Sequence, residues 1–253
     1  MSDPTAERLD RALVARGLAP TRERAQMLIR GEAVTVDGQV VTKPSHPVGC
    51  DSELAVIGEV LPYVGRGGVK LEEALRRFRV NVSGARCLDI GASTGGFTDC
   101  LLQRGAAHVV ALDVGHGQLH DSLRKDPRVT SMERVNARHI TADQFDAPFD
   151  IVVADVSFIS LTLVLPPAVS VLKPGGYLIA LIKPEFEAGR DAVGERGVVR
   201  DPEAIRQARD RVSRCAVEDL GLTKLGIIPS PIITGGNREY LACFRRPKEA
   251  PST

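Results

Sequence analysis

The second half of the chain alternates short apolar runs with stretches of helical periodicity. Continuous apolar runs are typical of parallel strands that helices cover on both faces. We therefore predict an α/β fold with a mostly parallel sheet. The expected strands are 87–90, 108–113, 129–135, 151–155, 177–183, 222–228 and 239–245, and the expected helices are 69–78, 97–104, 161–172 and 202 to about 220. The Gly-rich, charged segment 185–200 is a candidate lid.

The first 60 residues have a different pattern. Leu9, Leu13 and Val14 have helical spacing and are followed by Gly17, which suits a helix end. Thr21 is a suitable N-cap for a second helix over 22–30. Asp37-Gly38 then predicts a tight hairpin. Two short helices and a hairpin indicate a small separate module.

The strand at 87–90 runs into a glycine-rich turn and then a helix. Strand, tight turn and helix form the corner of an α/β sheet at which nucleotides bind. The glycine order is Gly91-x-x-x-Gly95-Gly96, with Ser93 where a dinucleotide fingerprint has its second glycine. Asp113 ends the next strand, where a carboxylate can accept hydrogen bonds from ribose hydroxyls. This combination favours S-adenosylmethionine over NAD, and the alternative is an ordinary turn that binds no ligand.

Composition narrows the class of protein. The chain has 253 residues, 43% of them hydrophobic and 26% charged, with a formal net charge of +1. No apolar run approaches the roughly 18 residues of a membrane span, and the polar N-terminus does not resemble a signal peptide. Five scattered cysteines indicate reduced thiols and a cytoplasmic protein. His116 and His120 are four residues apart without a third ligand, so we expect no metal.

Four polar residues far apart in sequence are expected to meet at one edge of the sheet. Asp155 and Lys183 end strands, Lys70 lies in the first turn of the helix before the glycine corner, and Glu239 begins the last strand if that strand is antiparallel. Lys183 is the candidate base that takes a proton from a hydroxyl nucleophile. Burial and Lys70 favour the neutral lysine, whereas Asp155 and Glu239 oppose it. A structural cluster of ion pairs is the alternative.

Arginines are concentrated in the N-terminal module, where charge alone does not distinguish an RNA-binding face from a solvated one. The sequence of residues 7–50 resembles the S4 RNA-binding domain. The resemblance runs from Arg-Leu-Asp-x-x-Leu-Val through Thr-Arg-x-x-Ala to Val-Asp-Gly. The resemblance implies that basic residues of the module and linker face structured RNA. We assign Arg8, Arg11, Arg22, Arg24, Arg30, Lys43 and Arg66 to this role.

Five separated motifs, at 65–71, 89–99, 154–160, 182–187 and 236–240, resemble the TlyA-type ribosomal RNA cytidine 2′-O-methyltransferases, some of which carry the name hemolysin. The methyltransferase part is similar to the FtsJ-like family, whose Lys-Asp-Lys-Glu tetrad falls on Lys70, Asp155, Lys183 and Glu239. The resemblance implies a class I, Rossmann-like sheet of seven strands with an antiparallel last strand, preceded by an S4-like α+β domain. The sequence departs from the family pattern at Gly65, where the family commonly has Ser, and in its linker, which has no Trp.

The resemblance sets the remaining expectations. We expect an S4-like domain over 1–59, a linker over 60–66, a methyltransferase domain over 67–246 and a flexible tail over 247–253. S-adenosylmethionine is the expected cofactor, and ribosomal RNA or ribosomal subunits are the expected partners of a monomer that does not bind membranes. The expected cofactor residues are Gly91, Ala92, Ser93, Thr94, Gly95, Gly96, Phe97, Asp113, Val114, Asn136 and Ala137, with Asn136 beside the adenine.

Three other functions fit the sequence less well. A membrane-active hemolysin is disfavoured because the sequence has no span and no long amphipathic helix. An RNA-binding assembly factor without chemistry is disfavoured by the intact tetrad and glycine turn. An NAD-dependent oxidoreductase is disfavoured by Ser93 in the fingerprint.

Overall fold

The computed structural model describes residues 7–57, 62–194 and 197–248. The chain divides into two compact units, Met1–Gly65 and Arg66–Thr253. The first two residues of the expected linker, 60–61, and most of the expected tail, 249–253, lie outside the described residues.

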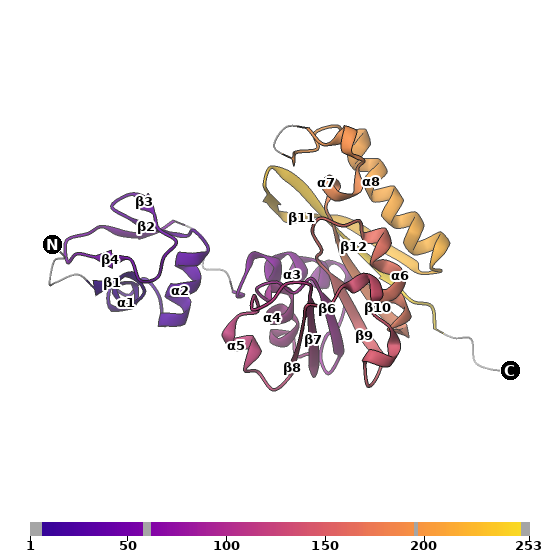
Figure 1. Cartoon of the computed structure of the whole chain (residues 1–253), viewed down its shortest axis with the longest axis horizontal. Helices are drawn as coiled ribbons and strands as arrows, with labels where there is room; N and C mark the ends of the chain where they lie inside the picture. Colours follow the sequence, from indigo (N-terminus) through magenta and orange to yellow (C-terminus); the bar gives the residue numbers. More distant parts are fainter. Residues whose placement is uncertain (1–6, 58–61, 195–196, 249–253) are drawn as a thin grey trace. The chain divides into compact units, whose positions relative to one another are not determined.

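The described residues of the N-terminal unit form two helices and five short strands (Figure 1). Helices α1 (Leu9–Ala15) and α2 (Arg22–Arg30) pack against each other, and the hydroxyl of Thr21 caps α2 by accepting a hydrogen bond from Arg24 N at 3.2 Å. Strand β2 (Val34–Val36) pairs with β3 (Gln39–Val40) and β5 (Leu54–Val56), and β1 (Glu7–Arg8) pairs with β4 (Pro47–Val48). The predicted helices and hairpin are confirmed.

The C-terminal unit is built on a seven-stranded sheet with the order β11-β12-β10-β9-β6-β7-β8. Its strands are β6 (Arg86–Ile90), β7 (His108–Asp113), β8 (Val129–Glu133), β9 (Phe149–Ala154), β10 (Leu172–Ile182), β11 (Thr223–Thr234) and β12 (Asn237–Arg245). Strand β12 lies antiparallel to both of its neighbours, β10 and β11. The mostly parallel sheet with a reversed last strand is confirmed.

Helices cover both faces of this sheet (Figure 1). They are α3 (Arg66–Phe78), α4 (Gly96–Gln103), α5 (Asp121–Arg124), α6 (Leu165–Ser170), α7 (Pro184–Glu187) and α8 (Pro202–Arg214), the last continued by a π-helical turn over Cys215–Asp219. Alternate strand residues such as Leu88, Val152 and Leu178 form one core with Leu165 of α6 and Val212 of α8. Helices α3 and α4 pack together, and α4 contacts β6 and β7. Asp201 caps α8 by accepting a hydrogen bond from Glu203 N at 3.0 Å.

The expected helix over 161–172 is confirmed only in part. The segment forms a 3₁₀ turn (Leu161–Leu163) and then the short α6, whose first turn holds both prolines. Leu172 already belongs to β10 and pairs with Phe149, with a register shift before Tyr177. A Cβ on Gly176 would lie 2.9 Å from the carbonyl oxygen of Asp150, so the glycine permits a close approach of two strands. Gly175-Gly176 therefore lies within a strand and does not end a helix.

Three other predicted boundaries also differ. Helix α3 begins at Arg66, inside the expected linker, because its first turn packs closely on α4. A Cβ on Gly67 would lie 3.3 Å from the Phe97 ring, and one on Gly96 would lie 3.0 Å from Gly68 N. Strand β12 begins at Asn237, so Glu239 is its third residue rather than its first. The preceding strand, β11, continues to Thr234, well beyond the expected end at 228.

Candidate active site

The glycine turn after β6 has a conformation that its sequence requires. Gly91 has φ 81°, and a Cβ there would lie 2.2 Å from the carbonyl oxygen of Asp155. Gly95, with φ 98°, is the N-cap residue of α4, and a Cβ there would clash with Leu119 and Leu123. Both positions therefore need glycine. The turn brings the first amides of α4 to the carboxyl end of the sheet.

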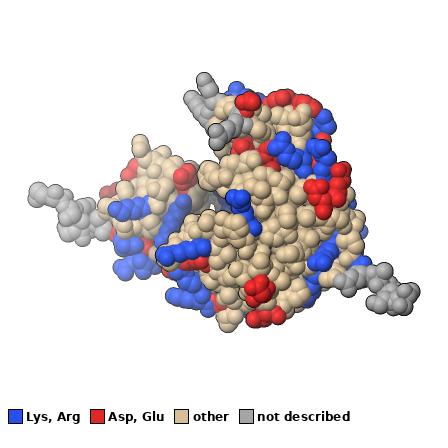
Figure 2. Space-filling model, turned by 45° about the vertical axis from the view of Figure 1, so that its right-hand side comes forward, with Lys and Arg blue, Asp and Glu red and all other residues tan. Residues whose placement is uncertain are grey.

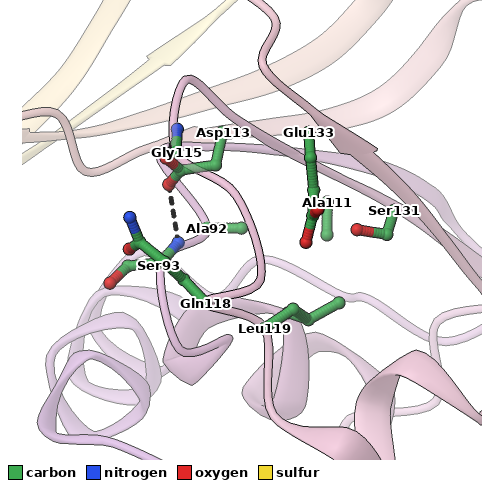
Figure 3. Close-up of a pocket in the computed structure, with 9 residues that line it drawn as sticks. All are labelled: Ala92, Ser93, Ala111, Asp113, Gly115, Gln118, Leu119, Ser131 and Glu133. Atoms are coloured by element: carbon green, nitrogen blue, oxygen red, sulfur yellow. Dashed lines mark hydrogen bonds between the residues drawn. The ribbon is translucent and has the colours of Figure 1, made fainter.

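Asp113 organises this turn from the end of β7. Its Oδ2 accepts a hydrogen bond from Ser93 N at 2.8 Å, and its Oδ1 accepts one from Gly115 N at 2.7 Å (Figure 3). A shallow hollow lies beside it, lined among others by Ala92, Gln118 and Glu133. Each carboxylate oxygen keeps a second lone pair, so Asp113 can still accept hydrogen bonds from ribose hydroxyls.

Asp89 lies beneath the turn and is fully buried. Its Oδ2 accepts a hydrogen bond from Thr98 Oγ1 at 2.7 Å, whereas its Oδ1 has no hydrogen-bond partner among the described residues. Burial, helped by the charges of Asp155 and Asp113 and opposed by the hydrogen bonds from Thr98, raises the pKa of Asp89 to about 7. Three acidic side chains around one turn favour a cationic ligand. The sulfonium and ammonium groups of S-adenosylmethionine fit this requirement.

The other predicted cofactor-binding residues differ in how far their side chains are exposed. Ala92, Gly96 and Phe97 are buried, so the turn presents mainly backbone there, whereas Thr94 is exposed. Val114 is 72% exposed beside Asp113. Asn136 is exposed and caps the 3₁₀ turn Ala137–His139 by accepting from Arg138 N at 3.1 Å. Ala137 packs partly against the core.

Lys183 and Asp155 form an ion pair at the same edge of the sheet. Their Nζ and Oδ1 atoms are 2.6 Å apart, and Lys183 Nζ also donates to Ser157 Oγ at 2.8 Å. The Lys183 side chain is 12% exposed and that of Asp155 is 21% exposed. Two partners fix the direction of the amine while part of it stays accessible to a substrate.

Lys70 and Glu239 form a second pair that is more deeply buried. Lys70 Nζ is 2.5 Å from Glu239 Oε2, and the side chains are 7% and 1% exposed. Thr234 Oγ1 also donates to Glu239 Oε2, at 3.3 Å. The tetrad therefore consists of two ion pairs, of which only the Lys183–Asp155 pair is open to substrate.

Glu185 was missed by the sequence reading. Its Oε2 is buried and has no hydrogen-bond partner in the part of the chain that the structure describes. Burial raises the pKa of Glu185, with a further contribution from the charge of Glu239, while Lys183 acts in the opposite direction. Glu185 is thus electrostatically linked to both pairs. The sequence feature that could have indicated a role for Glu185 is its position two residues after Lys183, in the segment predicted to be a lid.

The predicted RNA-binding residues fall into two groups. Arg8 and Arg22 both bind the buried carboxylate of Asp10, at 3.0 and 2.9 Å, and Gln26 donates to it as well. The Arg8 hydrogen bond is the largest of the contacts that hold the pKa of Asp10 well below its usual range. These two arginines therefore also stabilise the module, while Arg11, Arg30 and Lys43 are exposed.

The remaining basic residues differ from this pattern. Arg24 is half-buried on α2. Arg66 is exposed at the start of α3, which belongs to the C-terminal unit. Arg16 is exposed but donates to the carbonyl oxygens of Gly49, Cys50 and Ser52, so it ties α1 to the loop before β5. In the space-filling view, blue and red groups are interspersed over much of the visible surface (Figure 2).

The structure also bears on metals and membranes. His116 Nδ1 lies 2.5 Å from Glu133 Oε2, whereas His120 caps α5, so the two histidines do not share a helix face. Over residues 7–57, 62–194 and 197–248, no three His, Cys, Asp or Glu side chains are grouped as metal ligands. None of the helices described has the length and apolarity that crossing a membrane requires.

The reversed last strand, the glycine turn and the acidic residue after the second strand define a methyltransferase that uses S-adenosylmethionine. The chain belongs to the FtsJ-like methyltransferase family, whose model matches residues 63–246, and an S4 domain matches residues 7–53. The resemblance, the fold class and the methyl donor expected from the sequence are thereby confirmed.

Three similar proteins cover most of the chain. The 16S/23S rRNA (cytidine-2′-O)-methyltransferase TlyA of Mycobacterium tuberculosis is 46% identical over 94% of this chain and 89% of its own length. Hemolysin A of Brachyspira hyodysenteriae is 41% identical over 94% of this chain and 99% of its own. The solved structure of a putative hemolysin from Streptococcus thermophilus is 42% identical, covers 98% of this chain and 91% of its own, and has a TM-score of 0.75.

Proposed function

We propose that this protein transfers a methyl group from S-adenosylmethionine to the 2′-hydroxyl of a cytidine ribose in 16S or 23S ribosomal RNA, or in both. The names of its relatives support the substrate, and the S4 domain supports structured RNA as the partner. The single observation that carries the chemistry is the partly exposed Lys183 amine, held by Asp155 and Ser157 at the carboxyl end of the sheet.

The donor-binding residues are proposed from their place around the glycine turn. Asp113 would hold the ribose hydroxyls, and the amides of 91–97 would line the donor. Asp89 would face its positively charged part through the unpaired Oδ1. When bound, S-adenosylmethionine supplies a methyl group that is already strongly electrophilic. The protein therefore has to position a weak nucleophile and remove its proton.

Lys183 is proposed to remove that proton. Its amine donates to Ser157 Oγ and is ion-paired with Asp155, and in the neutral form its lone pair would accept the proton of the ribose hydroxyl. Lys70 is neutralised by Glu239 and is less exposed than Lys183, so it is the weaker candidate. The proposed role of the Lys70–Glu239 pair is to hold the surrounding elements in place.

An exposed aromatic side chain lies beside the proposed base. Phe158 is 92% exposed, has φ 65° and contacts the Phe186 ring in a tilted arrangement, with 5.3 Å between ring centroids. Its ring is therefore free to contact a base. Enzymes that modify a nucleotide take it out of the helix, and an aromatic ring stabilises the unstacked base. We propose this role for Phe158.

The proposed partner is a ribosomal subunit, which places the reaction in the cytoplasm, and we propose that one copy of the chain acts as a monomer. The exposed Arg11, Arg30 and Lys43 would neutralise phosphates, which fixes the position of the enzyme without reading sequence. The catalytic unit would then select the nucleotide.

Radiolabelled S-adenosylmethionine with separate small and large subunits tests the proposal. We expect label on a cytidine ribose of one or both subunits, mapped by reverse transcription that stops at 2′-O-methyl groups, and loss of label with Lys183→Ala. Naked ribosomal RNA, tested in parallel, shows whether assembled subunits are needed. Absence of label on every RNA while the donor still binds would overturn the proposal and favour an assembly factor. Leakage of dye from liposomes by the purified protein would favour the hemolysin.

A further inference from the structure

Glu187 is a buried carboxylate that the proposed reaction does not use. It is the last residue of α7 and only 2% of its surface is exposed. Burial raises the pKa of Glu187, against which its hydrogen bonds and the nearby Arg211 act. A buried carboxylate is costly unless each oxygen is well satisfied, so its partners indicate why it is there.

Both partners belong to the segment that follows β9. Glu187 Oε2 accepts a hydrogen bond from Ser160 Oγ at 2.7 Å, and Oε1 accepts one from Leu161 N, also at 2.7 Å. Leu161 begins a 3₁₀ turn, so this amide would otherwise lack a partner. Glu187 thus fixes the end of the loop 155–160.

The beginning of the same loop is held by Lys183, which directly precedes α7. Lys183 pairs with Asp155 and donates to Ser157, while Phe158 in the middle of the loop contacts the Phe186 ring of α7 in a tilted arrangement. The five residues 183–187 therefore contact the loop at its start, middle and end. A left-handed residue such as Phe158, with φ 65°, persists only when its surroundings fix it.

We propose that Glu187 is a positioning residue for methyl transfer, which sets the orientation of Asp155, Ser157 and Phe158 by holding the end of their loop. This inference rests on the proposed function. Glu187 itself touches neither donor nor RNA. Arg211 of α8 extends the connection by donating to the Glu187 carbonyl oxygen at 2.7 Å.

The test compares Glu187→Ala with Glu187→Gln. A glutamine can accept from Leu161 N and donate to Ser160 Oγ, because a hydroxyl can reverse its role. We expect kcat to fall about 10- to 100-fold in Glu187→Ala, since small displacements of reacting groups cost this much. Donor and RNA dissociation constants should stay within about two-fold, and Glu187→Gln should restore kcat to within about three-fold of wild type.

Two further variants separate positioning from stability. Ser160→Ala removes one of the two contacts with little risk to folding, and we expect kcat to fall about three- to ten-fold, with no further loss when it is combined with Glu187→Ala. Asp201→Ala removes the cap of α8 without touching the loop, so it controls for lost stability and should keep wild-type kcat when folded. All assays are made well below each variant's melting temperature.

Wild-type kcat in folded Glu187→Ala, or in Ser160→Ala, would overturn the inference. A parallel loss in Asp201→Ala would do so as well, because stability alone would then explain the effect. Failure of the wild-type protein to methylate any RNA would instead contradict the proposed function, so the two failures are distinguishable.

Discussion

Lys70 Nζ lies 2.5 Å from Glu239 Oε2, although the two residues are 169 positions apart in sequence. The pair fastens α3, which precedes the first strand of the sheet, to β12, which is its last. Because both side chains are almost completely buried, neither charge can be satisfied by water if its partner is lost.

Removing one member of this pair should therefore destabilise the protein. We expect Lys70→Met or Glu239→Gln to lower the free energy of unfolding by about 3–5 kcal/mol, measured by urea denaturation. The double variant Lys70→Met/Glu239→Leu should recover most of the loss. Arg76→Met, which breaks an exposed pair with Glu73, is the control and should cost less than about 1 kcal/mol. Equal losses in both single variants and in the control would contradict the prediction.

Arginine at position 183 distinguishes a base from a fixed positive charge. Arginine keeps the charge beside Asp155 but does not give up a proton. We expect Lys183→Arg to lower kcat at least about 100-fold, as loss of general base catalysis does, with donor affinity retained in calorimetry. Ser157→Ala, which removes only one contact of the amine, should lower kcat a few-fold. Substantial activity in Lys183→Arg would show that charge alone suffices.

The pH dependence of stability should report on Asp89. Its pKa is about 7 in the folded protein against an ordinary 3.8, so the folded state keeps a proton that the unfolded chain releases. The contribution of this group to stability is therefore complete below about pH 4 and is lost as the pH rises to about 7. Urea denaturation between about pH 4 and pH 8 should show a smaller decline in Asp89→Asn than in wild type. Identical slopes would contradict this assignment.

The salt dependence of RNA binding should report on the S4 domain. We expect each of Arg11→Ala, Arg30→Ala and Lys43→Ala to make the slope of log affinity against log salt less steep, by about the amount that one phosphate contact contributes. Fluorescence anisotropy with a labelled ribosomal RNA fragment measures this. Arg128→Ala is the control, because Arg128 pairs with Asp126 in the other unit. Unchanged slopes in all three variants would remove these residues from the interface.

Local patterns sufficed for much of the fold. The glycines at 91 and 95 occupy positions with positive φ where a Cβ would clash, so their spacing reflects the backbone directly. Glu239 and Lys70 were placed at the site by topology, because the ends of parallel strands share an edge. The helix expected over 161–172 is divided into a 3₁₀ turn and the short α6, and it ends early because Leu172 already pairs with the distant Phe149.

The hydrogen-bond and ion-pair partners of individual side chains could not be predicted from the sequence. Asp10 has the spacing of an exposed helix residue, and only the folded module shows that Arg8, Arg22 and Gln26 surround it. Glu187 and Glu185 were indistinguishable from the solvated charges of a flexible segment. Their burial depends on α7, a helix of four residues that is too short to have a periodicity of its own.

The distance in sequence between Lys70 and Glu239 also determines the order in which parts of the active site are synthesised. Translation delivers Lys70, Asp155 and Lys183 before β12, so during synthesis Lys70 is without its carboxylate and β10 lacks one neighbour. The S4 domain is already complete at that stage and can fold first. Under the proposed function, RNA-binding capacity would thus precede catalytic competence during synthesis, and β12 would complete the proposed active site.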